Sequence, residues 1–150
     1  MAGLPLRIRN YRGEDIEELS RIDQICFPAD IAFTRGEILF YLYHPKSIAR
    51  VAESSGRILG FVMARIESRS SARVITLDVV PEFRQRKIGT TLMNTLHGEL
   101  KRQGIEKSFL EVAVLNTPAQ CLYRKLQYQY LETLIGYYHG REDAYRMVRQ

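Results

Sequence analysis

The residues best suited to chemistry lie between positions 77 and 90, where an apolar strand, a short basic turn and a long amphipathic helix follow one another. The first turn of a helix has amide N–H groups without intrahelical partners and carries the positive end of the helix dipole. Arg84, Arg86 and Lys87 add positive charge there, and Gly89 permits close approach of the backbone to a ligand. This pattern predicts an anion cradle whose natural occupant is a pyrophosphate. The alternative is a solvated basic turn that only joins strand to helix.

The bulk composition predicts one soluble globular domain spanning residues 1–150. A chain of 150 residues that is 45% hydrophobic and 26% charged can bury a core without metal or disulfide staples. The net charge of +5 suits an anionic ligand or a nucleic acid and decides for neither. Apolar runs fall short of the ~18 residues that a membrane span requires. The first five residues lack the layout of a signal peptide, so the expected compartment is the cytoplasm.

Neither cysteine is expected to bind a metal. Cys26 and Cys121 have no Cys-x-x-Cys spacing and no clustered histidines beside them. Each is interpreted as a buried thiol that packs as a small apolar side chain. His97 has no partner at a meaningful spacing and is assigned to the exposed side of the long helix.

The helices that must position the cradle follow from hydrophobic periodicity and from capping residues. Apolar residues recur every three positions over residues 16–25 and predict a first helix. Thr34 and Glu37 fit a capping box at the start of a second helix. A long third helix begins near residue 88, and Gly104 caps its end. Its apolar face consists of Ile88, Leu92, Met93, Leu96 and Leu100.

The remaining elements complete a mixed α/β pattern. A fourth helix is expected from Thr117, as the N-cap, to about residue 126, with Pro118 in its first turn and Leu122 and Leu126 on its apolar face. Helices and strands thus alternate along the chain, and this order predicts helices on both faces of one sheet. The strands are predicted at residues 6–11, 47–53, 58–67, 73–80, 108–114, 128–135 and 144–148.

The basic turn resembles the pyrophosphate loop of the GCN5-related N-acetyltransferase (GNAT) superfamily. Arg84-x-x-Lys87-x-Gly89 is similar to that family's Arg/Gln-x-x-Gly-x-Gly/Ala pattern, with Lys87 in place of the first glycine. A cradle of backbone amides tolerates a side chain that points outward, although lysine disfavours positive φ. Residues 77–81 resemble the family's fourth strand, which lies just before the loop.

Three further stretches resemble the RimI-type branch of this family, which acetylates protein N-termini. Residues 110–128 are similar to its Leu-Glu-Val-x-x-x-Asn-x-x-Ala-x-x-Leu-Tyr-x-x-x-Gly-Phe pattern, with Gln127 in place of the glycine. Residues 137–147 are similar to its tyrosine-rich tail, and residues 25–28 to the loop between its first two helices. The matches cover most of the chain, from about residue 6 to 148.

The resemblance implies a GNAT fold, with a mixed, mostly antiparallel central sheet of six to seven strands, a splayed strand pair and about four flanking helices. It implies acetyl-CoA as the cosubstrate and no metal. Main-chain groups of Leu77 and Val79 would hold the pantetheine arm where the strand of residues 77–79 splays from that of residues 110–112, and an amide there could polarise the thioester carbonyl. The implied cofactor-binding residues are Leu77, Asp78, Val79, Arg84, Gln85, Arg86, Lys87, Ile88, Gly89, Thr90 and Asn116.

The same resemblance assigns catalytic roles to Glu111 and Tyr123. A free α-amino group has a pKa of ~7.7–8.0, so a general base, direct or through one water, is useful at neutral pH. Glu111 alternates with apolar neighbours and is the implied base; a solvent-facing glutamate is the alternative. Tyr123 matches the family's general acid, with a core tyrosine as the alternative. Asn116 can also serve as a turn or cap residue.

The resemblance also implies an acceptor groove with Phe27 and Pro28 in one wall and Tyr137 and Tyr138 in the other, although paired tyrosines also suit a plain strand. The expected acceptor is the α-amino group of a protein such as a ribosomal protein. A small-molecule amine, namely a polyamine, amino acid or antibiotic, is the alternative. A non-enzymatic module that binds nucleic acid is disfavoured because the basic residues are spread along the chain. A monomer or homodimer is expected, with no membrane or nucleic-acid partner.

Overall fold

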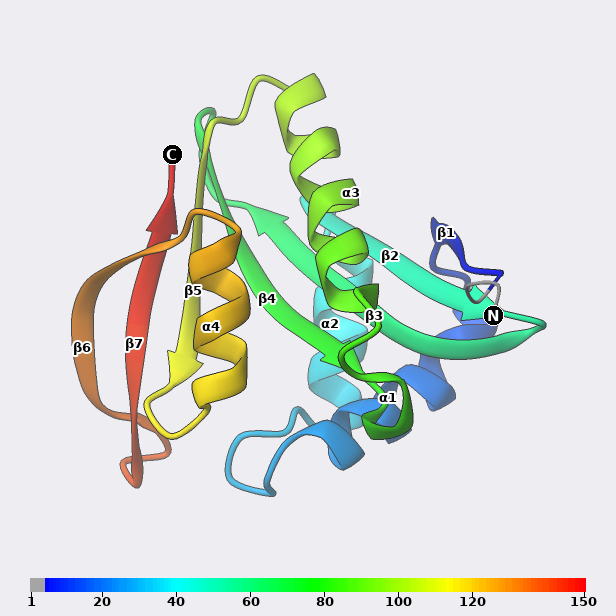
Figure 1. Cartoon of the computed structure of the whole chain (residues 1–150), viewed down its shortest axis with the longest axis horizontal. Coiled ribbons are helices and arrows are strands. Elements are labelled where there is room, and N and C mark those ends of the chain that lie inside the picture. The colour runs from blue at the N-terminus through cyan, green and yellow to red at the C-terminus, as the bar shows by residue number, and fades with distance from the viewer. Residues whose placement is uncertain (1–4) are drawn as a thin grey trace.

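Seven strands form one sheet in the computed structural model, which describes residues 5–150 (Figure 1). The four residues before Pro5, which belong to the stretch where no signal peptide is predicted, lie outside the described residues. The strands are β1 (Arg7–Asn10), β2 (Ser47–Ser54), β3 (Arg57–Ile66), β4 (Ser71–Val79), β5 (Lys107–Ala113), β6 (Gln129–Tyr138) and β7 (Glu142–Arg149). The helices are α1 (Ile16–Cys26), α2 (Arg35–Tyr43), α3 (Ile88–Arg102) and α4 (Thr117–Lys125), with short 3-10 helices at Gly13–Asp15 and Pro81–Phe83. The predicted order of elements and the predicted fold class are confirmed.

The sheet is antiparallel except at its centre, where β4 and β5 run parallel. The strand order is β1-β2-β3-β4-β5-β7-β6. The parallel pairing is confined to three positions, from Ser71 opposite Lys107 to Arg73 opposite Phe109. Beyond Arg73 the two strands diverge toward their carboxyl ends, as Figure 1 shows. The predicted splayed strand pair is therefore present, and α3 and α4 begin at its open end.

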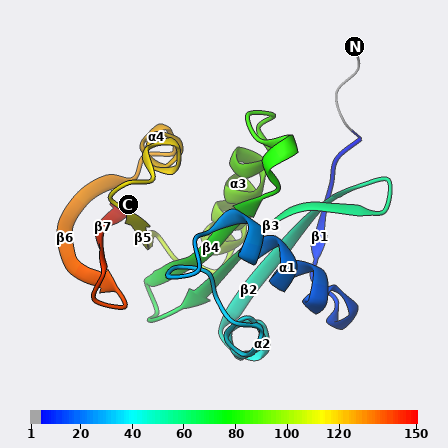
Figure 2. The same cartoon turned by 90° about the horizontal axis from the view of Figure 1, so that it is seen from below.

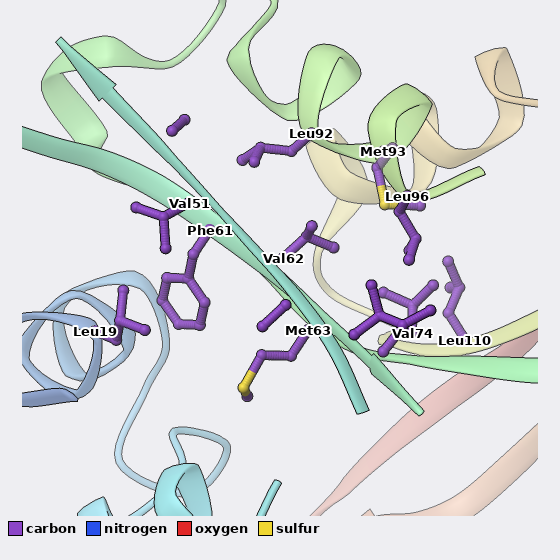
Figure 3. Close-up of a cluster of buried hydrophobic side chains, with 14 of the residues drawn as sticks. Leu19, Val51, Phe61, Val62, Met63, Val74, Leu92, Met93, Leu96 and Leu110 are labelled. Atoms are coloured by element: carbon purple, nitrogen blue, oxygen red, sulfur yellow. The ribbon is translucent and has the colours of Figure 1, made fainter. Parts of the chain in front are cut away.

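The hydrophobic core lies on both faces of the sheet, with α1 and α2 on one face and α3 and α4 on the other (Figure 2). Strand β3 is buried on both sides, which explains its nearly continuous apolar sequence. Phe61 points toward Leu19 of α1, while Val62 points toward Leu92 of α3 (Figure 3). Alternation along one central strand thus ties the two helical layers to the same sheet.

Local capping signals define the starts of α2 and α4 and the end of α3. Thr34 Oγ1 accepts from the Glu37 amide at 3.1 Å, and Glu37 Oε1 accepts from the Thr34 amide at 2.9 Å, so the predicted capping box is confirmed. Gly104 follows α3 with a φ of 76°. The N-cap of α4 is Asn116 rather than Thr117, because Asn116 Oδ1 accepts from the Ala119 amide at 3.3 Å.

Three predictions about burial are wrong. His97 is buried, and its Nε2 lies 2.8 Å from the hydroxyl of Tyr128. On α4 the buried residues are Gln120 and Tyr123, whereas the two predicted leucines are only partly buried. Cys121 is exposed, and Cys26 is half-buried. Within residues 5–150, every helix is too short or too polar to cross a membrane.

Candidate active site

The turn before α3 has the backbone of an anion cradle. Gln85 and Lys87 adopt left-handed conformations, with φ of 62° and 64°, and Lys87 is the N-cap of α3. This conformation costs a non-glycine residue about 1–2 kcal/mol, so it marks a strained turn. No side chain caps the first turn of α3, and no acidic residue lies in it. The amides of Ile88, Gly89 and Thr90 are therefore available to a ligand, and the site fits a diphosphate.

The basic side chains of this turn have different surroundings. Arg84 Nε donates to the carbonyl oxygen of Val79 at 3.0 Å, which ties the turn to the end of β4. The guanidinium carbon of Arg86 lies 5.2 Å from the centre of the Phe83 ring. Lys87 is exposed and forms no ion pair within the described part of the chain. Neither Arg86 nor Lys87 pairs with an acidic group of residues 5–150, so both cations are available to a phosphate.

Gly89 lies where α3, α4 and β4 come together. A Cβ at this position would lie 3.3 Å from Leu122 Cδ2, 3.6 Å from Leu77 Cδ2 and 3.8 Å from Val79 Cγ2. The residue is buried. In the sequence, Gly89 is interpreted as a position where the backbone comes close to a ligand. The structure gives a second reason, because α3 packs closely against α4 and β4 at this residue.

The predicted pantetheine strand presents its three residues in different directions. Leu77 and Val79 point toward α3, as their contacts with Gly89 show. Asp78 points to the opposite face, where it is 1% exposed and accepts a hydrogen bond from Thr76 Oγ1 at 2.6 Å. Only the backbone of Asp78 could therefore reach a ligand in the splay. Its side chain belongs to the interior beneath α1.

Glu111 is held in a network of charges at the splay. Its side chain is 6% exposed, so the alternative of a solvent-facing glutamate is excluded. Arg73 of β4 and Arg146 of β7 both donate to Oε2, the latter at 2.9 Å. The hydroxyl of Tyr137 donates to Oε1 at 3.3 Å. Burial and the negative charge of Glu111 raise the pKa of Tyr137 to about 12, so this hydroxyl keeps its proton.

Both arginines have a second acidic partner. Arg73 Nε donates to Glu67 at 2.9 Å, and Arg146 Nη1 donates to Glu132 at 3.4 Å. The network is therefore close to neutral and fixes the Glu111 carboxylate, while Oε1 remains its less occupied oxygen.

Tyr123 is a buried tyrosine whose hydroxyl proton is uncommitted. The residue is 8% exposed, and its ring packs against Tyr128 at 5.9 Å between centres. Burial, with smaller effects of nearby acidic and phenolic groups, raises its pKa well above the ordinary value. Its hydroxyl makes no hydrogen bond to any group of residues 5–150, Glu111 included. Tyr123 can therefore donate a proton or a hydrogen bond to a ligand in the splay.

The two predicted acceptor walls approach each other at the surface. Tyr137 and Tyr138 end β6, with ring centres 4.9 Å apart. Phe27 and Pro28 open the loop after α1, where Phe27 is half-buried and Pro28 exposed. An ion pair joins the loops, because Arg141 Nη1 lies 2.8 Å from Asp30 Oδ1. The structure thus brings Tyr137 to Glu111 and the first loop to the turn between β6 and β7.

Sequence reasoning missed Arg73, Arg146 and Arg141. Each is recognisable only from strand pairing or loop contact, since Arg73 reaches Glu111 through the short parallel register of β4 and β5. Arg146 does so because it lies directly opposite Glu111 on β7. One signal was present, namely a charged residue at position 73 within a strand rich in β-branched residues.

A sheet opened at one parallel pair, beside a helix N-terminus whose uncapped amides fit a diphosphate, is the arrangement expected of an acyltransferase that uses a coenzyme A thioester. The model of the acetyltransferase (GNAT) family matches residues 16–128, so the chain belongs to this family and is an acetyl-CoA-dependent N-acetyltransferase. The "N-alpha-acetyltransferase" of Saccharolobus solfataricus is 31% identical over 162 residues, covering 98% of this chain and 94% of that protein.

Solved structures agree on the fold. Ard1 from Thermoplasma volcanium superposes with a TM-score of 0.88 at 27% identity, and the match covers 96% of each chain. The ribosomal-protein-S18-alanine N-acetyltransferase from Escherichia coli superposes with a TM-score of 0.86 at 21% identity, covering 96% of this chain and 92% of that one. At this lower identity the second likeness supports the fold alone.

Proposed function

We propose that this enzyme acetylates the α-amino group of protein N-termini. The observation that carries the proposal is the placement of the Glu111 carboxylate at the splay, with the Tyr137 hydroxyl on its free oxygen. The aromatic end of β6 and the loop after α1 then form the sides of an entrance for an extended chain end. The name of the Saccharolobus solfataricus relative supports this acceptor class. A ribosomal protein is one acceptor of this kind.

The cofactor-binding residues follow from the cradle. We assign the diphosphate to the amides and side chains of residues 84–90, with Arg86 and Lys87 as the available cations. Backbone groups of Leu77, Asp78 and Val79 line the splay for the pantetheine arm, and Asn116 lies at its edge as the cap of α4. Acetyl-CoA supplies an acetyl group activated as a thioester.

The chain's own residues then handle the protons. Glu111 takes a proton from the acceptor ammonium through Oε1, directly or through one water, so that the neutral amine can attack the thioester carbon. Arg73 and Arg146 hold Oε2 in place. Tyr123 donates a hydrogen bond to the departing thiolate, because its buried hydroxyl has no internal partner and its raised pKa keeps the hydroxyl protonated. Burial in the splay excludes bulk water and strengthens these interactions.

The alternative acceptor is a small-molecule amine, and the charges at the entrance disfavour a polyamine. Asp30 is paired with Arg141, and Asp143 Oδ1 accepts from the Gly136 amide at 2.8 Å. Of the three acidic residues in the loop after α1 and at the turn between β6 and β7, only Glu142 is therefore left without such a contact among residues 5–150. We further infer that residues 1–150 act as one domain, as a monomer or homodimer.

A competition assay tests the proposed acceptor. Purified protein and acetyl-CoA are incubated with an equimolar mixture of peptides with different N-termini, spermidine, free amino acids and an aminoglycoside, and products are identified by mass spectrometry. We expect acetylated peptides to dominate and the Glu111→Gln variant to lose this product. Turnover of the small amines without any peptide product contradicts the proposal.

A further inference from the structure

Two buried carboxyl groups lie within hydrogen-bonding reach of each other beneath the loop between α1 and α2 (the acceptor loop, residues 27–34), and they have no role in the mechanism above. Asp23 of α1 is 0% exposed and Asp78 of β4 is 1% exposed. One oxygen of each has a donor, because the Phe33 amide donates to Asp23 Oδ2 at 2.7 Å and Thr76 donates to Asp78 Oδ1. Asp23 Oδ1 and Asp78 Oδ2 are sealed from solvent without a partner. A proton shared between the carboxyls would satisfy both of these oxygens.

The charges around the pair favour retention of that proton. Burial raises the pKa of Asp78 well above its ordinary value, and the neighbouring Asp23 raises it further. Burial also raises the pKa of Asp23, and Glu37 of α2 acts in the same direction. Arg84, in the turn after β4, opposes the shift at Asp78. The negative charge of Asp78 also acts on Cys26 of α1 and Tyr123 of α4, and both stay neutral because burial raises their pKa values.

The pair links two parts of the proposed active site. Asp23 holds the Phe33 amide and so closes the loop between α1 and α2, which contains Phe27 and Pro28. Asp78 lies between Leu77 and Val79 on the strand assigned to the thioester. A second contact follows the same path, since the Cys26 thiol donates to the Val79 carbonyl at 3.3 Å.

We propose that Asp23 and Asp78 are positioning residues that share one proton and thereby hold the acceptor loop against β4. The role in catalysis rests on the proposed function. Loss of the shared proton leaves two buried like charges, which repel each other and release the loop from the strand. The acceptor then binds less well at alkaline pH, whereas the cradle for acetyl-CoA, on the other side of β4, is unaffected.

Asparagine variants separate proton sharing from packing. In Asp78→Asn the amide donates permanently to Asp23, while its oxygen still accepts from Thr76, so the link cannot be lost by titration. In Asp23→Asn the asparagine amide donates to Asp78 instead, while its side-chain oxygen still accepts from the Phe33 amide. Asp78→Ala removes the link and is expected to raise the acceptor KM at every pH.

The first test compares the acceptor kcat/KM of Asp23→Asn, whose residue lies outside the cofactor strand, with that of the wild type between pH 6.5 and 10. The ionisation of the acceptor amine is common to both proteins and cancels in the ratio. We expect the ratio of kcat/KM, variant over wild type, to be near one at pH 6.5. Above the pKa of the shared proton the ratio should rise by about tenfold per pH unit, as loss of a single proton requires. The KM for acetyl-CoA should be equal in both. A ratio that is flat over this range overturns the catalytic role.

The second test needs no substrate. NMR titration of the aspartate carboxyl carbons should show one step far above the ordinary range to which Asp23 and Asp78 both respond, as loss of a single shared proton requires. Hydrogen exchange of the Phe33 amide should accelerate over the same pH range in the wild type, beyond its intrinsic rise, and not in Asp78→Asn. Independent titration near the ordinary pKa overturns the proton sharing. Shared titration and Phe33 release without peptide turnover refute the proposed acceptor and leave the positioning link intact.

Discussion

Replacing Glu111 by glutamine separates its proposed role as a base from its role as the centre of an ion-pair network. Glutamine keeps an oxygen for the Tyr137 hydroxyl, but it removes the negative charge that Arg73 and Arg146 share. It also cannot take up a proton from the attacking amine. The substitution therefore predicts both a loss of stability and a larger loss of turnover.

The stability cost follows from the partners that remain. Removing one member of a buried ion pair costs ~3–5 kcal/mol when the other is left unpaired. Here Arg73 retains Glu67 and Arg146 retains Glu132, and both guanidiniums are partly exposed. We therefore expect a loss of about 2 kcal/mol, the value of a charge-assisted hydrogen bond. For a chain of this size that corresponds to a fall in Tm of about 4–8 °C.

The catalytic effect is measured below the melting transition, as kcat and as KM for acetyl-CoA. General-base catalysis contributes ~100- to 10,000-fold, so kcat should fall by at least about 100-fold while the KM for acetyl-CoA stays the same. Glu132→Gln is the matched control, because Glu132 touches Arg146 but is half-exposed and lies outside the proposed machinery. It should cost under about 1 kcal/mol and leave kcat near the wild-type value. A stable Glu111→Gln enzyme with kcat within about threefold of wild type would show that Glu111 only holds the arginines.

Four further predictions concern single residues. Burial lowers the pKa of His97 to about 4, so the free energy of unfolding in urea of the wild type, minus that of His97→Gln, isolates this histidine from the other titrating groups. This difference should be constant above pH 6.5 and fall by about 3 kcal/mol toward pH 4, because only the unfolded wild-type chain takes up the proton there, and a flat difference contradicts the burial of a neutral imidazole. Gly89→Val should weaken acetyl-CoA binding in calorimetry, since its side chain must displace Leu122 or shift α3, and unchanged affinity refutes the geometry of the cradle. Tyr123→Phe should lower kcat with little change in Tm, because its hydroxyl has no internal partner; a large fall in Tm instead indicates a structural hydroxyl. Arg141→Ala should cost under about 1 kcal/mol yet change the KM for peptides, and equal KM values would place the loop contact outside the acceptor path.

The sequence predicted the elements and their order because its helices and strands carry strong local signals. The capping box of Thr34 and Glu37 and the apolar face of α3 depend only on neighbouring residues, and the structure confirms them. The splay of β4 and β5 was predicted from the family resemblance. The resemblance also led to Glu111 and Tyr137, which the structure places in contact.

The wrong predictions concern residues whose partners are distant in the chain. His97 is buried because Tyr128, at the end of α4, provides a hydrogen bond, and nothing at helical spacing signals it. Asn116 replaces Thr117 as the cap because both residue types suit that role and only the backbone decides between them. Asp78 was grouped with the cofactor strand, yet its side chain is directed under α1 toward Asp23, which no local pattern could reveal.

The most direct test of the proposed reaction is a single-turnover experiment with isotopically labelled acetyl-CoA and one peptide that has a free N-terminus and an internal lysine. Tandem mass spectrometry then locates the label on the peptide. We predict labelling of the α-amino group at a rate that falls sharply in Glu111→Gln. Label on the lysine side chain alone, or an unlabelled peptide when acetyl-CoA is bound, would contradict the proposed function.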